Sequence, residues 1–166
     1  MKTLTTPQLQ HRIRICIWIV IAGLALSGIT AFPLETELGW IKDHLTWAPT
    51  VLQQWITQIY NILHVVNQHY PYLSYGTDWL AFAHVMLAIV FIGPLKDPVK
   101  NIWVIQFGMI ACVAIVPLAF IAGPIRQIPV FWRLIDCSFG VGGIIPLGLA
   151  YRYIKILEKE SRHPDQ

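Results

Sequence analysis

Four apolar runs, each close to the length that crosses a bilayer, constrain this chain more than any other feature of its sequence. A spanning helix needs about 20 apolar residues, because each residue advances the helix by about 1.5 Å. The runs cover residues 13–32, 79–95, 102–122 and 130–151. Only 13% of the 166 residues are charged, against about 25% in soluble domains. We therefore expect an all-α membrane protein: a four-helix transmembrane bundle that forms one membrane domain over residues 1–166.

The first run also has features of a cleaved signal peptide. Arg12 and Arg14 form a basic flank, and the small residues Ser27 and Gly28 would suit a cleavage site. However, the apolar core of a signal peptide has about 7–15 residues, and this run is longer. We expect it to be retained as the first spanning helix.

The Lys and Arg residues predict the orientation of the chain. With the N-terminus inside, three of the 12 lie on the outer side, namely Lys42, Arg126 and Arg133. The inner side holds the other nine, which are Lys2, Arg12, Arg14, Lys96, Lys100, Arg152, Lys155, Lys159 and Arg162. Cytoplasmic loops carry an excess of these residues. Both termini are therefore predicted to be cytoplasmic, with residues 152–166 as a tail into which the last helix continues.

The first outer segment, residues 33–77, is too apolar for a free loop. Apolar side chains recur at helical spacing over 50–69, and amides occupy the opposite face. Thr50 followed by Gln53 resembles the start of a helix with a capping box. We expect an amphipathic interfacial helix here, since Trp and Tyr residues of this segment suit a membrane boundary. A lid over an outward-opening pocket and a docking face for a partner are the alternatives.

Ionisable residues inside the spans are the main clues to function, because each must find a partner or cost several kcal/mol. Asp136 lies six residues from the start of the last run, and His84 lies six residues past Asp78. Both are therefore about 9 Å below the outer surface at 1.5 Å per residue. A contact between His84 and Asp136 across the bundle is geometrically allowed.

Arg133 and Asp136 are three residues apart, so their side chains share one helix face. Together with His84 and Asp78 they could form a polar cluster in the outer half of the bundle. Arg126 would lie on its rim, where Arg126 and Arg133 could bind an anion or a lipid headgroup. One interpretation is a satisfied pair that fixes helix register, and the other is a site that binds a headgroup or moves protons.

The sequence predicts no cofactor and no metal site. Each of Cys16, Cys112 and Cys137 lies in an apolar run, and no Cys/His spacing suits a metal. His64 and His69 are five residues apart, which is poor for joint ligation from one helix face. His84 is the single His within the spans, which excludes a haem held by two His of this chain. The net charge of +3 has no clustered basic face, so nucleic acid is not an expected partner.

Three strings in the second half of the chain carry a resemblance. TDWLAFAHV, FIGPLKDPV and IAGPIRQIPVFWRLIDCSFG lie within residues 76–151. This region resembles a family of small bacterial integral membrane proteins with no assigned activity. The resemblance implies a four-span protein of the bacterial inner membrane and implies nothing about chemistry.

Three classes of function remain open. The leading one is a non-enzymatic accessory or assembly component of the membrane, partnered by another membrane protein or by a second copy of the chain. The second is a small transporter or proton relay that uses His84, Asp136 and Arg133. The third is a membrane enzyme or binder that acts on a lipid headgroup or a quinone at the outer surface. The sequence contains no nucleotide-binding or hydrolase motif, so we lean toward a protein that is not an enzyme.

Overall fold

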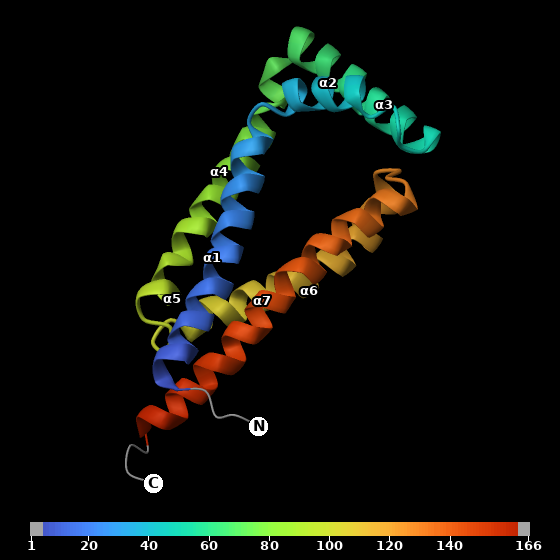
Figure 1. Ribbon diagram of the computed structural model, residues 1–166. Helices are drawn as coiled ribbons and strands as arrows, with labels where there is room; N and C mark the ends of the chain where they lie inside the picture. The colour runs from blue at the N-terminus through green and yellow to red at the C-terminus, as the bar shows by residue number, and fades with distance from the viewer. Residues whose placement is uncertain (1–4, 163–166) are drawn as a thin grey trace. The chain divides into compact units, whose positions relative to one another are not determined.

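The computed structural model describes residues 5–162, and its regular elements over this range are all helices. They are α1 (Thr6–Ala31), α2 (Leu34–His44), α3 (Thr50–His69), the 3-10 turn η1 (Pro71–Leu73), α4 (Tyr75–Val90), α5 (Ile92–Lys96), α6 (Ile102–Ile125) and α7 (Val130–Arg162). Figure 1 shows their order along the chain. Four helical stretches are long and apolar enough to cross a membrane, namely Thr6–Ala31, Pro71–Lys96, Ile102–Ile125 and Val130–Glu160. The chain is therefore an all-helical, multi-pass membrane protein by length and composition.

The second span differs from its predicted form. The run 79–95 is not one continuous helix, because α4 ends at Val90 and α5 begins at Ile92. Pro94 gives the physical reason: it has no N–H to donate to the carbonyl of Val90, and its ring crowds that carbonyl. The helix therefore breaks at Phe91 and resumes as one short turn.

The other spans extend beyond their predicted ends. α1 begins at Thr6, where position 13 was expected, and α7 runs to Arg162, as the charged sequence after Tyr151 indicates. α6 continues to Ile125 through Pro124, so the connection that the predicted runs 102–122 and 130–151 leave between them is shorter than seven residues. Pro124 lies in the last turn of α6, where its fixed φ is compatible with the helix even though the carbonyl of Phe120 loses its usual N–H donor.

The turn after α6 has a left-handed residue that is not glycine. Gln127 has a φ of 56°. The N–H of Ile128 donates to the carbonyl of Gly123 at 2.9 Å, and that of Gln127 donates to the carbonyl of Pro124 at 3.1 Å. This pattern is a Schellman motif, which satisfies carbonyls left free at the end of α6.

Contacts divide the described chain into two compact units. One comprises residues 5–22 and 88–162, and the other comprises residues 23–87. α1 and α4 each contribute to both units. The expectation of a single domain stays a prediction.

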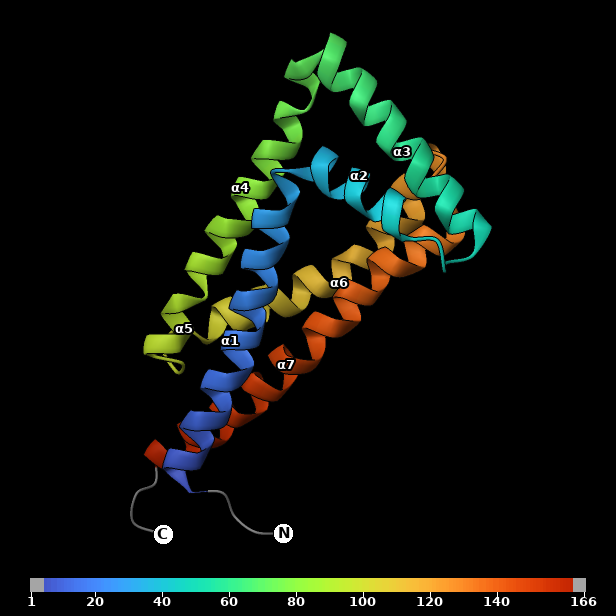
Figure 2. The same cartoon turned by 45° about the horizontal axis from the view of Figure 1, so that its top comes forward.

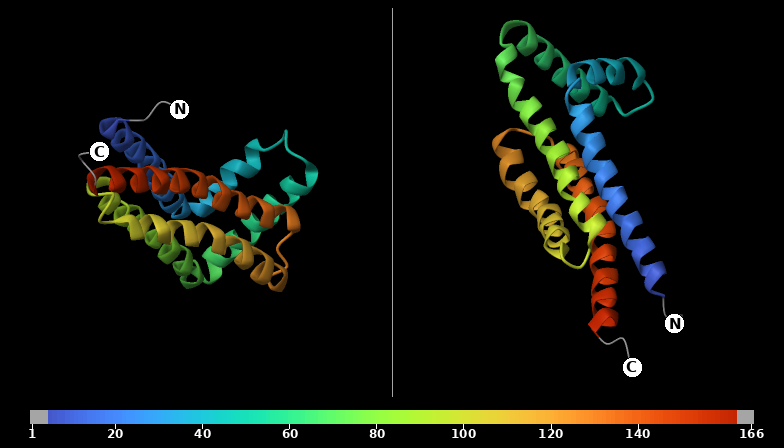
Figure 3. Two further views of the ribbon diagram at one scale, coloured as in Figure 1. Left: turned by 90° about the horizontal axis from the view of Figure 1, so that it is seen from below. Right: turned by 90° about the vertical axis from the view of Figure 1, so that its left-hand side faces the viewer.

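In the first unit, α6 and α7 lie side by side (Figure 3). Its core includes Leu9, Ile13 and Ile17 of α1, all fully buried and four residues apart, so they form one helix face. Val104, Ile105, Leu147 and Ile154 bury apolar surface from α6 and α7 in the same unit.

Large apolar side chains stay exposed on the other faces of these helices. Ile110 of α6, for example, is 68% exposed, and Leu118 and Phe139 are also exposed. Such surface is stable in lipid and costly in water. It agrees with the spanning assignment.

In the second unit, α2 packs against α3 (Figure 2). The helix expected over 50–69 is present as α3, but the expected capping box is wrong. The side chain of Gln53 instead donates from Nε2 to the carbonyl of Ala48 at 2.7 Å. The α-helix α2 was not expected from the sequence.

Candidate functional site

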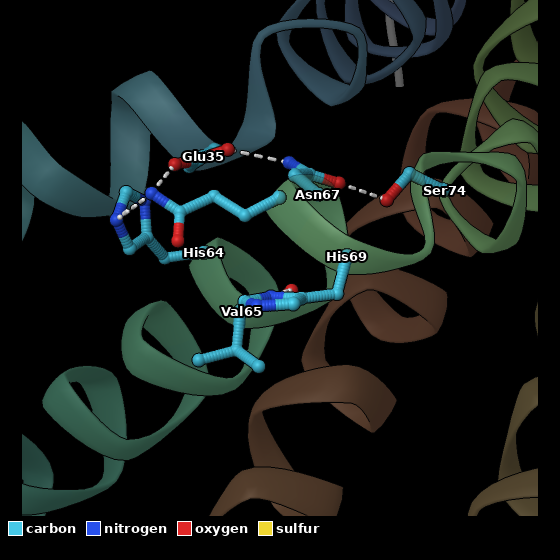
Figure 4. Close-up of polar contacts among 7 residues, drawn as sticks. Glu35, His64, Val65, Asn67, His69 and Ser74 are labelled. Carbon is cyan, nitrogen blue, oxygen red and sulfur yellow. Dashed lines mark hydrogen bonds and ion pairs between the residues drawn. The ribbon is translucent and has the colours of Figure 1, made fainter.

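A chain of polar side chains joins α2 and α3 to Ser74, the residue that directly precedes α4 (Figure 4). Glu35 of α2 is its centre. His64 Nδ1 donates to Glu35 Oε1 at 2.5 Å, and Asn67 Nδ2 donates to Glu35 Oε2 at 2.5 Å. Ser74 then donates its hydroxyl to Asn67 Oδ1. Both carboxylate oxygens of Glu35 are therefore engaged by α3.

The arrangement fixes the ring of His64. The other ring nitrogen, Nε2, lies 2.9 Å from Gln68 Nε2. The ring also stacks on Tyr60, with centroids 5.8 Å apart. Tyr60 in turn contacts α2, because the Nζ of Lys42 lies 4.3 Å from the centroid of the Tyr60 ring.

The contacts of Glu35 favour its charged form. Its pKa is lowered, first by the hydrogen bond from Asn67 and second by that from His64, both of which stabilise the carboxylate. Glu35 therefore remains an ionised group that holds α2 to α3.

A cavity of about 240 Å³ opens beside this polar chain. Two carboxylates line it, those of Glu35 and Asp78. No described residue makes a hydrogen bond or an ion pair with the Asp78 side chain. The remaining lining residues are Ala31, Phe32, Pro33, Leu34, Thr36, Leu63, Asn67, Ser74 and Thr77. The lining of the cavity thus combines two acidic side chains with polar and apolar residues.

His84, the proposed partner of Asp136, has a local contact. Its Nδ1 lies 2.8 Å from the carbonyl of Leu80, one turn earlier in α4. The ring is therefore held by its own helix. His84 and Asp78 belong to the unit of residues 23–87, whereas Arg126, Arg133 and Asp136 belong to the other, and the two units are described separately. The predicted cluster of these residues stays a prediction.

Arg133 packs against α6. A Cβ built on Gly123 would lie 2.3 Å from Arg133 Cδ, so the stem of Arg133 covers this glycine. Its guanidinium carbon lies 5.9 Å from the centroid of the Phe120 ring. Nε is buried and finds no hydrogen-bond partner among the residues described. The stem therefore contributes to the packing of α6 on α7.

The expected ion pair on α7 is not formed. Within the described chain, no ion pair within 4.0 Å joins Arg133 to Asp136. Asp136 is half-buried, and Arg126 is exposed in the turn that ends α6. Arg133 turns toward α6 because the missing side chain of Gly123 leaves room for its stem.

Sequence reasoning missed the site around Glu35. His64 and Asn67 are three residues apart, so they share a face of α3, and this spacing could have indicated a common partner. Glu35 is 29 residues away from His64, and no local pattern connects them.

No protein-family model, curated protein or solved structure matches the chain.

Proposed function

We propose that the four apolar helices form a bundle in the inner membrane of a bacterium, with both termini in the cytoplasm and α3 as an amphipathic helix at the outer boundary. The excess of nine Lys and Arg residues on the inner side, against three outside, supports this orientation. Membership in the bacterial family that residues 76–151 resemble is part of the proposal. A C-terminal fusion to alkaline phosphatase should be inactive and one to a green fluorescent protein should fluoresce. The opposite result would overturn the orientation.

The function we propose is that of a non-enzymatic accessory component that binds another membrane protein through one face of α3. The observation that carries it is the exposed face of α3, formed by Val51, Gln54, Gln58, Ile62, Val65 and His69. These residues follow one another at intervals of three or four, so they make a single stripe. Val51, Ile62 and Val65 are 62%, 57% and 51% exposed.

The face of α3 opposite the stripe packs on α2, which holds the stripe in a fixed position. Glu35, Gly39 and Lys42 of α2 engage His64, Asn67 and Tyr60 of α3. α3 is therefore part of a folded pair of helices. A preformed surface binds a partner without a large cost of ordering.

The composition of the stripe favours a protein over lipid headgroups. α3 contains no Lys, Arg, Asp or Glu over its whole length. Helices that lie on a membrane surface usually carry Lys or Arg, which are attracted to anionic lipids. Protein interfaces are depleted of charge at their centre, and a mixture of aliphatic and amide side chains fits that pattern.

Site-specific photocross-linking in native membranes tests this function. A benzophenone side chain at Ile62, and separately at Gln58 or Val65, should give the same discrete cross-linked protein. The matched control is Ile110 of α6, which is at least as exposed as Ile62 but lies within a span. Substitution Gln58→Lys in a chain that carries the probe at Ile62 should abolish the cross-link without loss of expression.

Two outcomes would overturn the proposal. Cross-links to lipid alone from all three positions of α3 would assign the stripe to the membrane. An identical set of cross-linked proteins from α3 and from Ile110 would mean that the contacts are not specific to the stripe.

A second candidate is an outer-surface binder of an amine-bearing headgroup, favoured by the unpartnered carboxylate of Asp78 in the cavity beside Glu35. Such a binder should lose affinity for an ethanolamine headgroup on substitution Asp78→Asn. Substitution Asp43→Asn serves as the control, since this carboxylate is exposed and does not line the cavity. Equal affinity in both variants would contradict this candidate.

A further inference from the structure

A second cavity lies in the unit of residues 5–22 and 88–162, where α1 begins and the span Pro71–Lys96 ends. Its volume is about 400 Å³. The first residues of α1, which precede most of the apolar run, line the cavity. The last residues of the span that ends at Lys96 also line it, through α5. The full lining is Thr6, Gln10, Ile13, Arg14, Pro94, Leu95, Lys96, Asp97, Pro98, Val99 and Leu157.

Hydrogen bonds hold the wall of this cavity between α5 and α6. The backbone N–H of Asp97 donates to the carbonyl of Gly93 at 3.0 Å. Asn101 donates from Nδ2 to the carbonyls of Gly93 and Asp97, at 3.2 and 2.9 Å. The connection is therefore a fixed turn that forms one wall of the cavity.

Two cations line the cavity without a partner. No hydrogen bond, ion pair or ring contact engages the side chain of Arg14 or of Lys96 within the described part of the chain. The neighbouring Arg12 differs, since its Nη1 donates to the hydroxyl of Tyr153 at 3.3 Å and its guanidinium lies 5.8 Å from the centroid of that ring. Arg14 and Lys96 are the positive charges left free to bind a ligand.

The one carboxylate in the lining is already engaged. Asp97 Oδ1 accepts the backbone N–H of Lys100 at 3.1 Å, and Oδ2 lies 3.4 Å from Lys100 Nζ. The backbone N–H of Lys100 is the main cause of the lowered pKa of Asp97. Asp97 is therefore ionised but paired, and the cavity retains an excess of positive charge. Thr6 is also engaged, since its hydroxyl donates to Glu160 Oε2 at 3.0 Å.

We propose that this cavity binds a phosphate group through Arg14 and Lys96, and that the group belongs to an anionic phospholipid. Guanidinium and ammonium groups form charge-assisted hydrogen bonds with phosphate oxygens. Basic pockets between spanning helices at the membrane boundary are suited to lipid headgroups.

The apolar part of the lining favours a lipid over a free phosphate ester. Leu95, Pro98 and Val99 border the same cavity as the two cations and are only partly buried, so they present apolar surface to a ligand. A lipid offers a phosphate and an acyl chain from one molecule, and burial of its methylene groups adds to the binding free energy. A free phosphate ester has only the polar contacts.

Titration of the full chain in a non-ionic detergent tests the proposal. The probes are dihexanoyl phosphatidylglycerol, dihexanoyl phosphatidylcholine and glycerol 3-phosphate, and calorimetry gives the affinity and the stoichiometry. We expect one site for the phosphatidylglycerol probe. The double variant R14Q/K96Q should weaken binding about 25-fold, since each charge near the site contributes roughly five-fold.

The matched control is R152Q/K159Q, which removes two exposed cations of α7 that do not line the cavity. It should leave the affinity within about two-fold of the wild-type value. The variant R14K/K96R keeps both charges and should restore most of the binding. A melting curve of each variant establishes that it is folded.

Three results would overturn the proposal. Equal weakening by R14Q/K96Q and R152Q/K159Q would mean diffuse surface charge without a site. Equal affinity for the zwitterionic phosphatidylcholine would exclude recognition of net negative charge. Binding of glycerol 3-phosphate as tight as that of the lipid would keep the phosphate site but overturn its assignment to a phospholipid.

Discussion

Gly140 of α7 lies directly against the carbonyl oxygen of Cys112 of α6. A Cβ built on Gly140 would come within 2.6 Å of this backbone oxygen, which is closer than a carbon atom can approach it. Gly143 faces the same residue, with a built Cβ 2.8 Å from Cys112 Sγ. Small residues at such positions let two helix backbones approach closely in a membrane. Cys112 therefore marks a point of close approach between α6 and α7.

Substitution Gly140→Ala should destabilise the α6–α7 pair by about 1–3 kcal/mol, because the methyl group forces the backbones apart. Gly142 is a matched control on the same helix, since a Cβ there meets nothing within 4 Å. Gly142→Ala should be neutral or stabilise by up to about 1 kcal/mol through helix propensity. Thermal melting of the purified variants in detergent measures both. Equal melting temperatures for the two variants would contradict this packing.

Replacing Gln127 by glycine should stabilise the folded protein. Its φ of 56° is costly for a residue with a Cβ and free of cost for glycine. Gln127→Gly should therefore stabilise the turn by about 0.5–1 kcal/mol, and Gln127→Ala should give no such gain. Thermal melting is again the measurement, and a lower melting temperature for the glycine variant than for the alanine variant would contradict the left-handed conformation.

The α2–α3 pair should weaken in acid. The pKa of Glu35 is lowered in the folded protein, so its stabilising contribution is present above the ordinary pKa of glutamate and is lost as the pH falls through the folded value. Hydrogen exchange of the α2 and α3 amides, corrected for the intrinsic rate at each pH, should show falling protection between about pH 6 and about pH 3.

Substitution Glu35→Gln should remove most of this pH dependence and lower the protection at neutral pH. Glu37→Gln is the control on the same helix, because no hydrogen bond or ion pair of the Glu37 side chain is formed within the part of the chain described. An unchanged pH profile in Glu35→Gln would contradict the role of this carboxylate.

Arg133 and Asp136 should behave independently. Because no ion pair within 4.0 Å joins them, the double-mutant cycle of Arg133→Gln and Asp136→Asn should give a coupling free energy below about 0.5 kcal/mol. The free energy of unfolding of the four proteins in detergent provides the cycle. A coupling above about 1 kcal/mol would mean that the pair forms in the folded protein.

Apolar spans can be predicted from sequence because unpaired backbone groups are costly in hydrocarbon. A chain that crosses lipid must satisfy every backbone N–H and C=O within one helix, so an apolar run of sufficient length predicts the element that contains it. The third run illustrates this, since α6 begins at Ile102 as predicted. The sequence predicts the ends of the spans less accurately than their existence. A helix break occurs next to Pro94 in the second run, whereas α6 continues through Pro124.

The sequence by itself determined that this chain is helical, that it has four segments able to span a membrane, and that a further helix covers residues 50–69. These properties depend on composition and spacing within short windows. Only the tertiary structure decided which polar and small residues form contacts between helices. It joined Glu35 to His64, turned Arg133 onto Gly123, and selected Gly140 rather than Gly142 as the point of close approach. Each of these relationships connects different helices, and side chains on separate helices meet only when the helices pack.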